Sequence, residues 1–258
     1  MTTHATPART PAAATPPVPP VSPPADASAP AAPCAAHGAR SDEAGGLEVC
    51  PARGLRSHFA HPRGWLGRFA GALMARKNAA MNDAAVARLP LRPEDRVLEI
   101  GFGHGRALAA LAARVPRGRA AGVDVSETMV AMASRRLRRE IAAACVELRR
   151  GGADALPFPD ASFDAAYAAN TVQFWPGPER SLREVRRVLR PGGTLLLAIR
   201  LHEPGLGRFA SPGFHPAQVD DVALRLAACG FAVRREDVRA GRALALLFAT
   251  RPAVEGER

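Results

Sequence analysis

A glycine-rich turn follows a short apolar run and precedes a helical pattern. The run RVLEI occupies residues 96–100, glycines stand at 101, 103 and 105, and RALAALAARV follows. Glycine accepts positive φ and lets a ligand approach the main chain closely, and the N–H groups of a helix start attract polar or anionic groups. The spacing is G-x-G-x-G, whereas the dinucleotide fingerprint G-x-G-x-x-G would need glycine at Arg106. The turn therefore predicts a nucleoside-type site and disfavours a nicotinamide-dependent oxidoreductase.

Polar side chains also stand where three further predicted strands end. Asp124 ends AAGVDV, where its carboxylate can accept hydrogen bonds from both ribose hydroxyls of a nucleoside; a helix-capping or loop aspartate is the alternative. Asp154 follows VELRRG and can accept a hydrogen bond from an adenine amino group, with Ala155 and Leu156 against the ring, or it is a turn aspartate. Asn170 ends SFDAAYAAN and either lines the binding crevice or caps the strand.

Strand and helix patterns alternate from residue 95 onward. SETMVAMASRRLRREIAA reads as a single helix capped by Ser126, and PAQVDDVALRLAACG reads as a helix that stops at Gly230. Residues 190–193 read as a tight turn into the strand TLLLAIR. The last two strand patterns, FAVRREDVR and ALALLFAT, are separated by three residues and predict a hairpin. The alternation predicts an α/β fold with a mostly parallel sheet and one antiparallel strand.

The first part of the chain has a different composition. Residues 1–57 are rich in Pro and Ala, so they bury too little apolar surface to offset chain entropy and we expect a disordered tail. No long apolar run is present, so we expect no membrane span. The four cysteines show no disulfide-framework spacing, so we expect a cytoplasmic protein. Zinc-type ligands occur in this region, but their spacing is irregular and we expect no metal site; they are Cys34, His37, Cys50 and His58. Cys145 and Cys229 read as small buried residues.

The formal net charge of +11 comes almost entirely from arginine. Many of these arginines cluster on two predicted helices, in residues 135–139 and 183–190. Solvated helix faces are the favoured interpretation, and a surface for RNA or an acidic substrate is the alternative.

Four segments, in order, resemble the motifs of class I S-adenosylmethionine (SAM)-dependent methyltransferases, and the similarity is greatest to the ubiquinone/menaquinone C-methyltransferase subgroup. They are VLEIGFGHG, GVDVS, GGADALPFPDASFD and EVRRVLRPGGTLLL, within residues 96–200. The resemblance implies a Rossmann-like, seven-stranded, mostly parallel sheet with an antiparallel last strand and helices on both faces. It also implies a methyltransferase domain over residues 93–258, preceded by a helical cap over residues 58–92, and SAM as the cofactor.

The resemblance also implies which residues surround SAM. They are Glu99, Gly101, Phe102, Gly103, Gly105, Asp124, Val125, Met129, Asp154, Ala155 and Asn170. Asn78 and Asn82 of the cap either face the acceptor or are surface residues. Phe174 and Trp175 either line an apolar acceptor pocket or anchor the next helix. His104 departs from the small residue that such families often carry at this position.

A small organic methyl acceptor is the favoured substrate. The Asn/Asp-Pro-Pro-aromatic sequence of many nucleic-acid amino-methyltransferases is replaced by Asn-Thr-Val-Gln at residues 170–173, so nucleic acid is disfavoured. The alternatives are an RNA or protein methyltransferase and a SAM-binding regulatory protein without catalysis. His104, His202 and His215 are candidate bases, but each also reads as a loop histidine, so no catalytic residue is predicted.

Overall fold

The computed structural model describes residues 79–203 and 213–253. The predicted tail over residues 1–57, most of the predicted cap, Asn78 and the four zinc-type ligands lie outside the described residues. The domain boundary at residue 93 stays a prediction.

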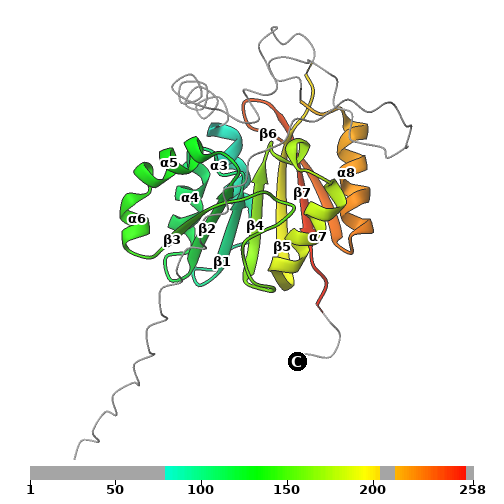
Figure 1. The fold of residues 1–258 in the computed structure, drawn as a ribbon. Helices are drawn as coiled ribbons and strands as arrows, with labels where there is room; N and C mark the ends of the chain where they lie inside the picture. Colours follow the sequence, from blue (N-terminus) through cyan, green and yellow to red (C-terminus); the bar gives the residue numbers. More distant parts are fainter. Residues whose placement is uncertain (1–78, 204–212, 254–258) are drawn as a thin grey trace, which may run out of the picture. The chain divides into compact units, whose positions relative to one another are not determined.

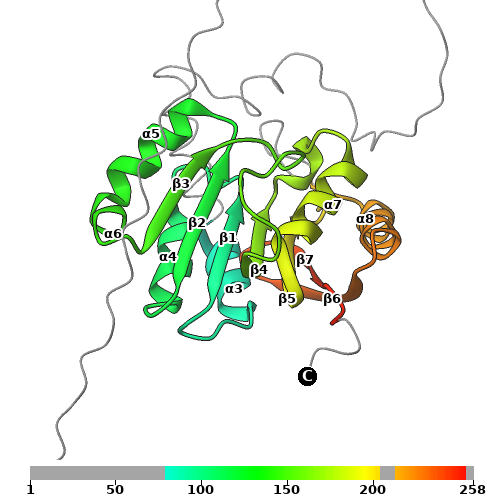
Figure 2. The same cartoon turned by 60° about the horizontal axis from the view of Figure 1, so that its bottom comes forward.

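Seven strands form one sheet in the order β3-β2-β1-β4-β5-β7-β6 (Figure 2). Their bounds are β1 Arg96–Ile100, β2 Arg119–Asp124, β3 Val146–Arg150, β4 Phe163–Ala169, β5 Leu189–Arg200, β6 Ala232–Arg239 and β7 Ala243–Thr250. β7 pairs antiparallel with both β5 and β6, and the other pairs are parallel. The predicted fold class, with its closing hairpin and its single antiparallel strand, is confirmed.

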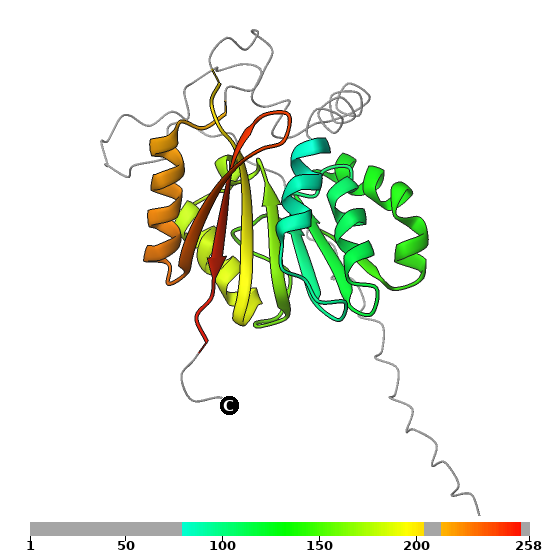
Figure 3. The same cartoon turned by 180° about the vertical axis from the view of Figure 1, so that it is seen from behind.

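Helices cover both faces of the sheet. The helices are α3 Ala79–Arg88, α4 Arg106–Arg114, α5 Glu127–Arg136, α6 Arg138–Ala142, α7 Pro178–Val188 and α8 Pro216–Ala228, with the 3-10 turn η1 Val172–Phe174. The cyan α3 lies in front of the sheet in Figure 3, and α7 lies in front of it in Figure 1. Within the described ranges, no helix is long and apolar enough to cross a membrane.

The two faces have separate apolar cores. Buried residues of α3, α4 and α5 pack on one face with Val97, Ala165 and Leu196 of the sheet. Buried residues of α7 and α8 pack on the other face with Leu98 and Leu197. Alternate residues of the same strand thus enter opposite cores, as the two-residue period of a strand requires. The strands are apolar on both sides, which is typical of a parallel sheet covered by helices.

Two local predictions were wrong. The helix expected to continue past residue 136 is interrupted at Leu137 (φ −98°, ψ 20°), which buries the Leu137 side chain although α6 buries none. Residues 190–193 are part of β5, because the main chains of Gly192 and Gly193 bond with Arg251 at 2.8 Å. The register of β5 against β4 shifts at this point.

The expectation for the two cysteines was wrong for Cys145, which is exposed, whereas Cys229 is half-buried. Cys145 lies in the turn before β3, next to Ala144, which has a positive φ of 56°.

The two leucines of α8 provide a test of the core on the α7 and α8 face. Leu226 is fully buried, and Leu224 on the same helix is 70% exposed. We expect Leu226→Ala to lower the free energy of unfolding by about 2–5 kcal/mol, because it leaves a cavity. We expect Leu224→Ala to change it by less than about 0.5 kcal/mol. Denaturant titration measures both; equal losses would contradict this packing.

Candidate functional site

The loop between β1 and α4 depends on glycine. Gly101, Gly103 and Gly105 have φ values of 76°, 55° and 82°, which side-chain-bearing residues rarely adopt. A Cβ atom at Gly101 would lie 2.5 Å from Cγ2 of Thr171, in the loop after β4. The Gly101 N–H donates to the carbonyl oxygen of Val123 at 2.7 Å. The loop therefore runs tightly between the carboxyl ends of β2 and β4.

Asp124 connects this loop to the start of α5. Its Oδ2 accepts a hydrogen bond from the Gly103 N–H at 2.9 Å, and its Oδ1 accepts one from the Ser126 N–H at 2.8 Å. Ser126 caps α5, as predicted, by accepting from the Met129 N–H. Asp124 is 8% exposed, so its carboxylate is held in one orientation. The predicted ribose contacts of Asp124 stay a prediction.

Glu99 is a buried acid at the end of β1. It is 4% exposed, and its Oε2 has no hydrogen-bond partner among the described residues. Burial, with a further contribution from the charge of Asp124, raises the pKa of Glu99 well above its usual range. A buried carboxylate without a partner is costly unless a cation or donor reaches it. SAM carries an ammonium group on its methionyl part, so this acid fits the predicted cofactor.

Helix α3 is anchored beside Glu99 by side chains from the sheet and from α4. The hydroxyl of Tyr167, on β4 in register with Glu99, donates to Oδ1 of Asn82 at 3.0 Å. Arg106 pairs with Asp83 at 2.9 Å. Tyr167 is fully buried, and burial, Glu99 and Asp83 raise the pKa of Tyr167. Asn82 thus contacts Tyr167 at the end of β4, and its role toward an acceptor stays a prediction.

Tyr167, Asp83 and Arg106 were not predicted as parts of the site. Tyr167 reads in the sequence as an ordinary strand aromatic, and Arg106 was noted only as the residue that breaks the dinucleotide fingerprint. One feature of the sequence could have drawn attention to Tyr167. It is the single tyrosine of the chain, and it stands in the predicted strand three residues before Asn170.

Asn170 uses its side chain in contacts within the fold. Its Oδ1 accepts from the Arg200 N–H at 3.0 Å, and its Nδ2 lies 3.2 Å from Sδ of Met81 on α3. Its own φ is 50°, a region that asparagine tolerates better than most residues. The amide therefore ties together the carboxyl ends of β4 and β5 and α3. This geometry favours the strand-capping interpretation of Asn170 over a direct contact with SAM.

The predicted adenine side is partly exposed. Val125 is 43% exposed, whereas Met129 and Leu156 are buried, and Leu156 packs in the core on the α7 and α8 face. The Asp154 carboxylate lies 4.0 Å from Nη2 of Arg180. Ala155 is exposed next to it.

Phe102 does not present its ring to the loop. It is 3% exposed, and its ring packs over Gly122 of β2, where a Cβ atom would lie 2.6 Å from Phe102 Cδ1. Any contribution of Phe102 to the predicted cofactor site therefore comes from its main chain.

The two predicted acceptor-pocket aromatics differ in environment. Trp175 is 9% exposed and packs in the α7 and α8 core, as the anchoring interpretation expected. Phe174 is 48% exposed, directly after the loop at the end of β4. Phe174 is therefore the one of the pair that a bound molecule can contact.

The candidate histidines lie in two places at the carboxyl edge of the sheet. His104 is half-buried in the glycine loop, and burial, followed by Arg136 and Arg106, lowers its pKa. The rings of His202 and His215 stack with centroids 4.3 Å apart, and both residues are exposed. His202 N–H donates to the carbonyl oxygen of Phe214 at 2.8 Å, which closes the segment after β5. Among the described residues, no group of three or more His, Cys, Asp or Glu could hold a metal ion.

Residues 98–197 match the family described as the methyltransferase domain. This segment is a methyltransferase domain. The matched residues include the glycine loop, Asp124, Asp154 and Asn170. The predicted family resemblance and the predicted enzyme class are confirmed.

Curated relatives agree with this assignment, and a solved structure has the same fold. The chain is 28% identical over 134 residues to an uncharacterized methyltransferase, YdaC, of Bacillus subtilis, covering 52% of this chain and 72% of the relative. It is 35% identical over 130 residues to the demethylmenaquinone methyltransferase of Symbiobacterium thermophilum, covering 50% of this chain and only 51% of that relative. A SAM-dependent methyltransferase structure from Aquifex aeolicus has the same fold, with a TM-score of 0.60, 23% identity, and coverage of 71% of this chain and 97% of the other.

Glu99 provides a test of the buried-acid geometry. Because the folded-state pKa of Glu99 is raised above its unfolded value of about 4.3, ionising it opposes folding, and its contribution to stability falls as pH rises from about 4.3 through the folded pKa. We expect Glu99→Gln to gain stability relative to wild type over that interval, measured by denaturant unfolding at several pH values. Glu147→Gln on β3, at an exposed glutamate, is the control. A Glu99→Gln difference independent of pH would contradict this environment.

Proposed function

We propose that this domain transfers a methyl group from SAM to a small organic acceptor at the carboxyl edge of the sheet. The observation that carries the proposal is the convergence of two buried carboxylates, Glu99 and Asp124, on a loop of three glycines with positive φ. The predicted cofactor residues keep their roles as proposals, except Asn170, whose side chain makes contacts within the fold.

Each carboxylate has a distinct task in this proposal. Glu99 accepts the ammonium group of the methionyl part, which supplies the partner that its Oε2 lacks among the described residues. Asp124 accepts the ribose hydroxyls while the main chain of Gly103 and Ser126 holds it in place. Val125, Asp154 and Ala155 border the adenine.

SAM brings an already activated methyl group, so the protein's task is alignment and exclusion of water. Orientation alone can lower such a barrier by about 7–11 kcal/mol. Helix α3, held by Tyr167 and Arg106, closes the site beside Glu99. For an acceptor that must lose a proton, His104 is the nearest candidate base to the loop. Its lowered pKa keeps the imidazole neutral at pH 7 and able to accept a proton.

A small acceptor is supported by the exposed Phe174 and by relatives whose names give small-molecule substrates, such as the demethylmenaquinone methyltransferase. An RNA or protein acceptor is favoured only by the net charge of +11. Many of the arginines of the described part form ion pairs with acidic side chains. The small-molecule acceptor therefore remains the better-supported proposal.

Asp124 is the position at which to test cofactor binding. We expect Asp124→Asn to weaken binding of SAM and of S-adenosylhomocysteine by roughly tenfold to more than a hundredfold, because hydrogen bonds to a charged group contribute about 1.5–3 kcal/mol. Calorimetric titration gives both affinities. Asp220→Asn removes a carboxylate that pairs with Arg235 on the surface, and we expect no change. Equal effects of the two substitutions would contradict the proposed site.

The acceptor is tested by following S-adenosylhomocysteine release with hydroxylated aromatic and quinol compounds, with RNA and with protein. We expect turnover with a small aromatic acceptor, and Phe174→Ala should raise its KM without changing SAM affinity. Leu224→Ala, another exposed apolar residue, should leave KM unchanged. Turnover with RNA or protein alone would replace the small-molecule proposal. Binding of SAM without turnover on any acceptor would favour the regulatory alternative.

A further inference from the structure

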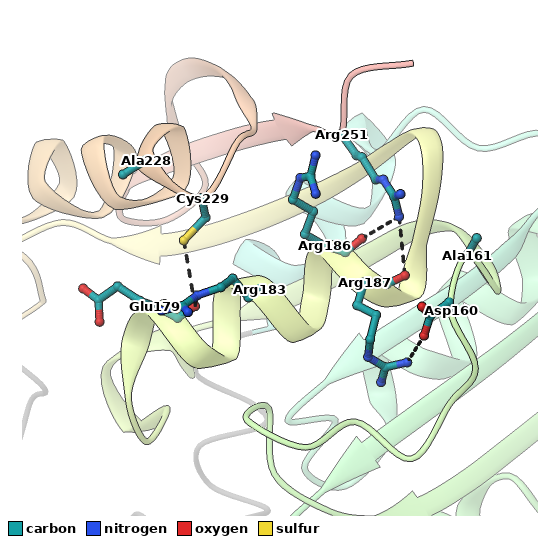
Figure 4. Close-up of a pocket in the computed structure, with 9 residues that line it drawn as sticks. All are labelled: Asp160, Ala161, Glu179, Arg183, Arg186, Arg187, Ala228, Cys229 and Arg251. Carbon is teal, nitrogen blue, oxygen red and sulfur yellow. Dashed lines mark hydrogen bonds and ion pairs between the residues drawn. The ribbon is translucent and has the colours of Figure 1, made fainter. Parts of the chain in front are cut away.

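A second cavity lies away from the glycine loop, between α7, the end of α8 and the residues after β7 (Figure 4). Its volume is about 730 Å³. It is lined by Asp160, Ala161, Glu179, Arg183, Arg186, Arg187, Ala228, Cys229 and Arg251. Asp160 and Ala161 precede β4, and Arg251 follows the antiparallel β7. The cavity therefore reaches the amino-terminal edge of the parallel strands, opposite the edge that holds the proposed SAM site.

The two acids of the cavity are already paired. Asp160 Oδ1 accepts from Arg187 Nη1 at 2.6 Å, and Arg187 also bonds Glu184 at 2.7 Å. Glu179 forms an ion pair with Arg225, which is not part of the lining. Both acids are thus in direct contact with other arginines, and Glu179 acts on Arg183 only through a weaker charge interaction.

Three arginines of the lining contact no carboxylate among the described residues. Arg183 and Arg186 donate through Nε to the carbonyl oxygens of Glu179 and Gly230, at 3.1 and 3.4 Å. Arg251 donates through Nη1 to carbonyl oxygens at the end of α7, at 2.6–3.5 Å. These bonds engage one side of each guanidinium group, and among the described residues no other side-chain or main-chain partner is recorded for the remaining N–H donors.

The uncharged groups around Arg183, Arg186 and Arg251 do not neutralise the positive charge of these three side chains. The C-terminal end of a helix carries about half a negative charge, which offsets only part of three guanidinium groups at and beside α7. Burial raises the pKa of the Cys229 thiol, so this side chain stays neutral and adds no negative charge. Among the described residues, the lining of the cavity thus carries an excess of positive charge.

The volume of the cavity and the residues that line it indicate which class of ligand it can bind. A volume of about 730 Å³ falls within the range of small-molecule sites. The lining contains no aromatic side chain, so it offers no platform on which a nucleobase could stack, as single-stranded nucleic acid sites commonly do. The guanidinium group of arginine matches phosphate oxygens in bidentate geometry. Three guanidinium groups offer more N–H donors than a single carboxylate can accept, so a ligand with several phosphate oxygens fits better.

We propose that this cavity is a second ligand site, separate from the methyl-transfer site, that binds a small oligophosphate. The positive charges of Arg183, Arg186 and Arg251 attract the phosphate groups. Their hydrogen bonds to carbonyl oxygens restrict the orientation of the three guanidinium groups before the ligand binds. This proposal does not depend on the identity of the methyl acceptor or on SAM binding.

The test is calorimetric titration of inorganic pyrophosphate into the full chain at near-physiological salt. We expect saturable binding of one pyrophosphate per chain. The double variant Arg183→Gln/Arg186→Gln should weaken it at least tenfold, because each substitution removes charge-assisted hydrogen bonds. Arg135→Gln/Arg138→Gln removes the same charge from exposed positions on α5 and α6 and should leave binding unchanged. SAM affinity, measured on both double variants, reports whether the fold and the first site are intact.

Three outcomes would overturn the proposal: no saturable binding of pyrophosphate to wild type, equal weakening in both double variants, or no weakening in Arg183→Gln/Arg186→Gln. A single-stranded RNA oligonucleotide is titrated in parallel. If RNA binds, loses affinity in Arg183→Gln/Arg186→Gln and pyrophosphate does not bind, the cavity belongs to an RNA surface instead.

Discussion

The candidate site depends on one topological constraint: β1 and β4 are neighbours in the sheet, but the chain leaves them toward opposite faces. After β1 the chain turns to α4 on one face, and after β4 it turns to α7 on the other. Loops that leave adjacent parallel strands in opposite directions separate, and a crevice opens between them at the carboxyl edge. Gly101 and Thr171, one from each loop, lie in close contact at this edge.

At the carboxyl ends of β1 and β2 the protein buries charged side chains, which are rare in a core that serves only stability. Glu99 and Asp124 are both buried carboxylates, and the charge of Asp124 helps to raise the pKa of Glu99. Asp124 is compensated by two main-chain N–H groups, whereas Glu99 Oε2 has no such partner among the described residues. Proteins commonly retain unfavourable groups of this kind where a ligand completes the environment.

The arginines that give the chain its charge fall into two classes in the described part. Some, such as Arg187 and Arg235, bridge two acidic side chains and stabilise loops and strand edges. Others, such as Arg251, use main-chain carbonyl oxygens and keep their positive charge uncompensated by nearby acids. The net charge of +11 is therefore a poor guide to binding, because the local pairing decides where positive potential remains.

Sequence patterns were sufficient to predict the fold class, the glycine turn, the cap at Ser126, the closing hairpin and the resemblance to SAM-dependent methyltransferases. These features rest on local signals: side-chain periodicity, positive φ at glycine and hydrogen bonds within a few residues. The tertiary structure alone decided that Asn170 bonds across to Arg200 and Met81, that Trp175 lies in the core while Phe174 is exposed, and that Tyr167 holds Asn82. Each of these contacts joins segments far apart in the chain, and it depends on which strands become neighbours and on which face each helix packs. No local pattern contains that information.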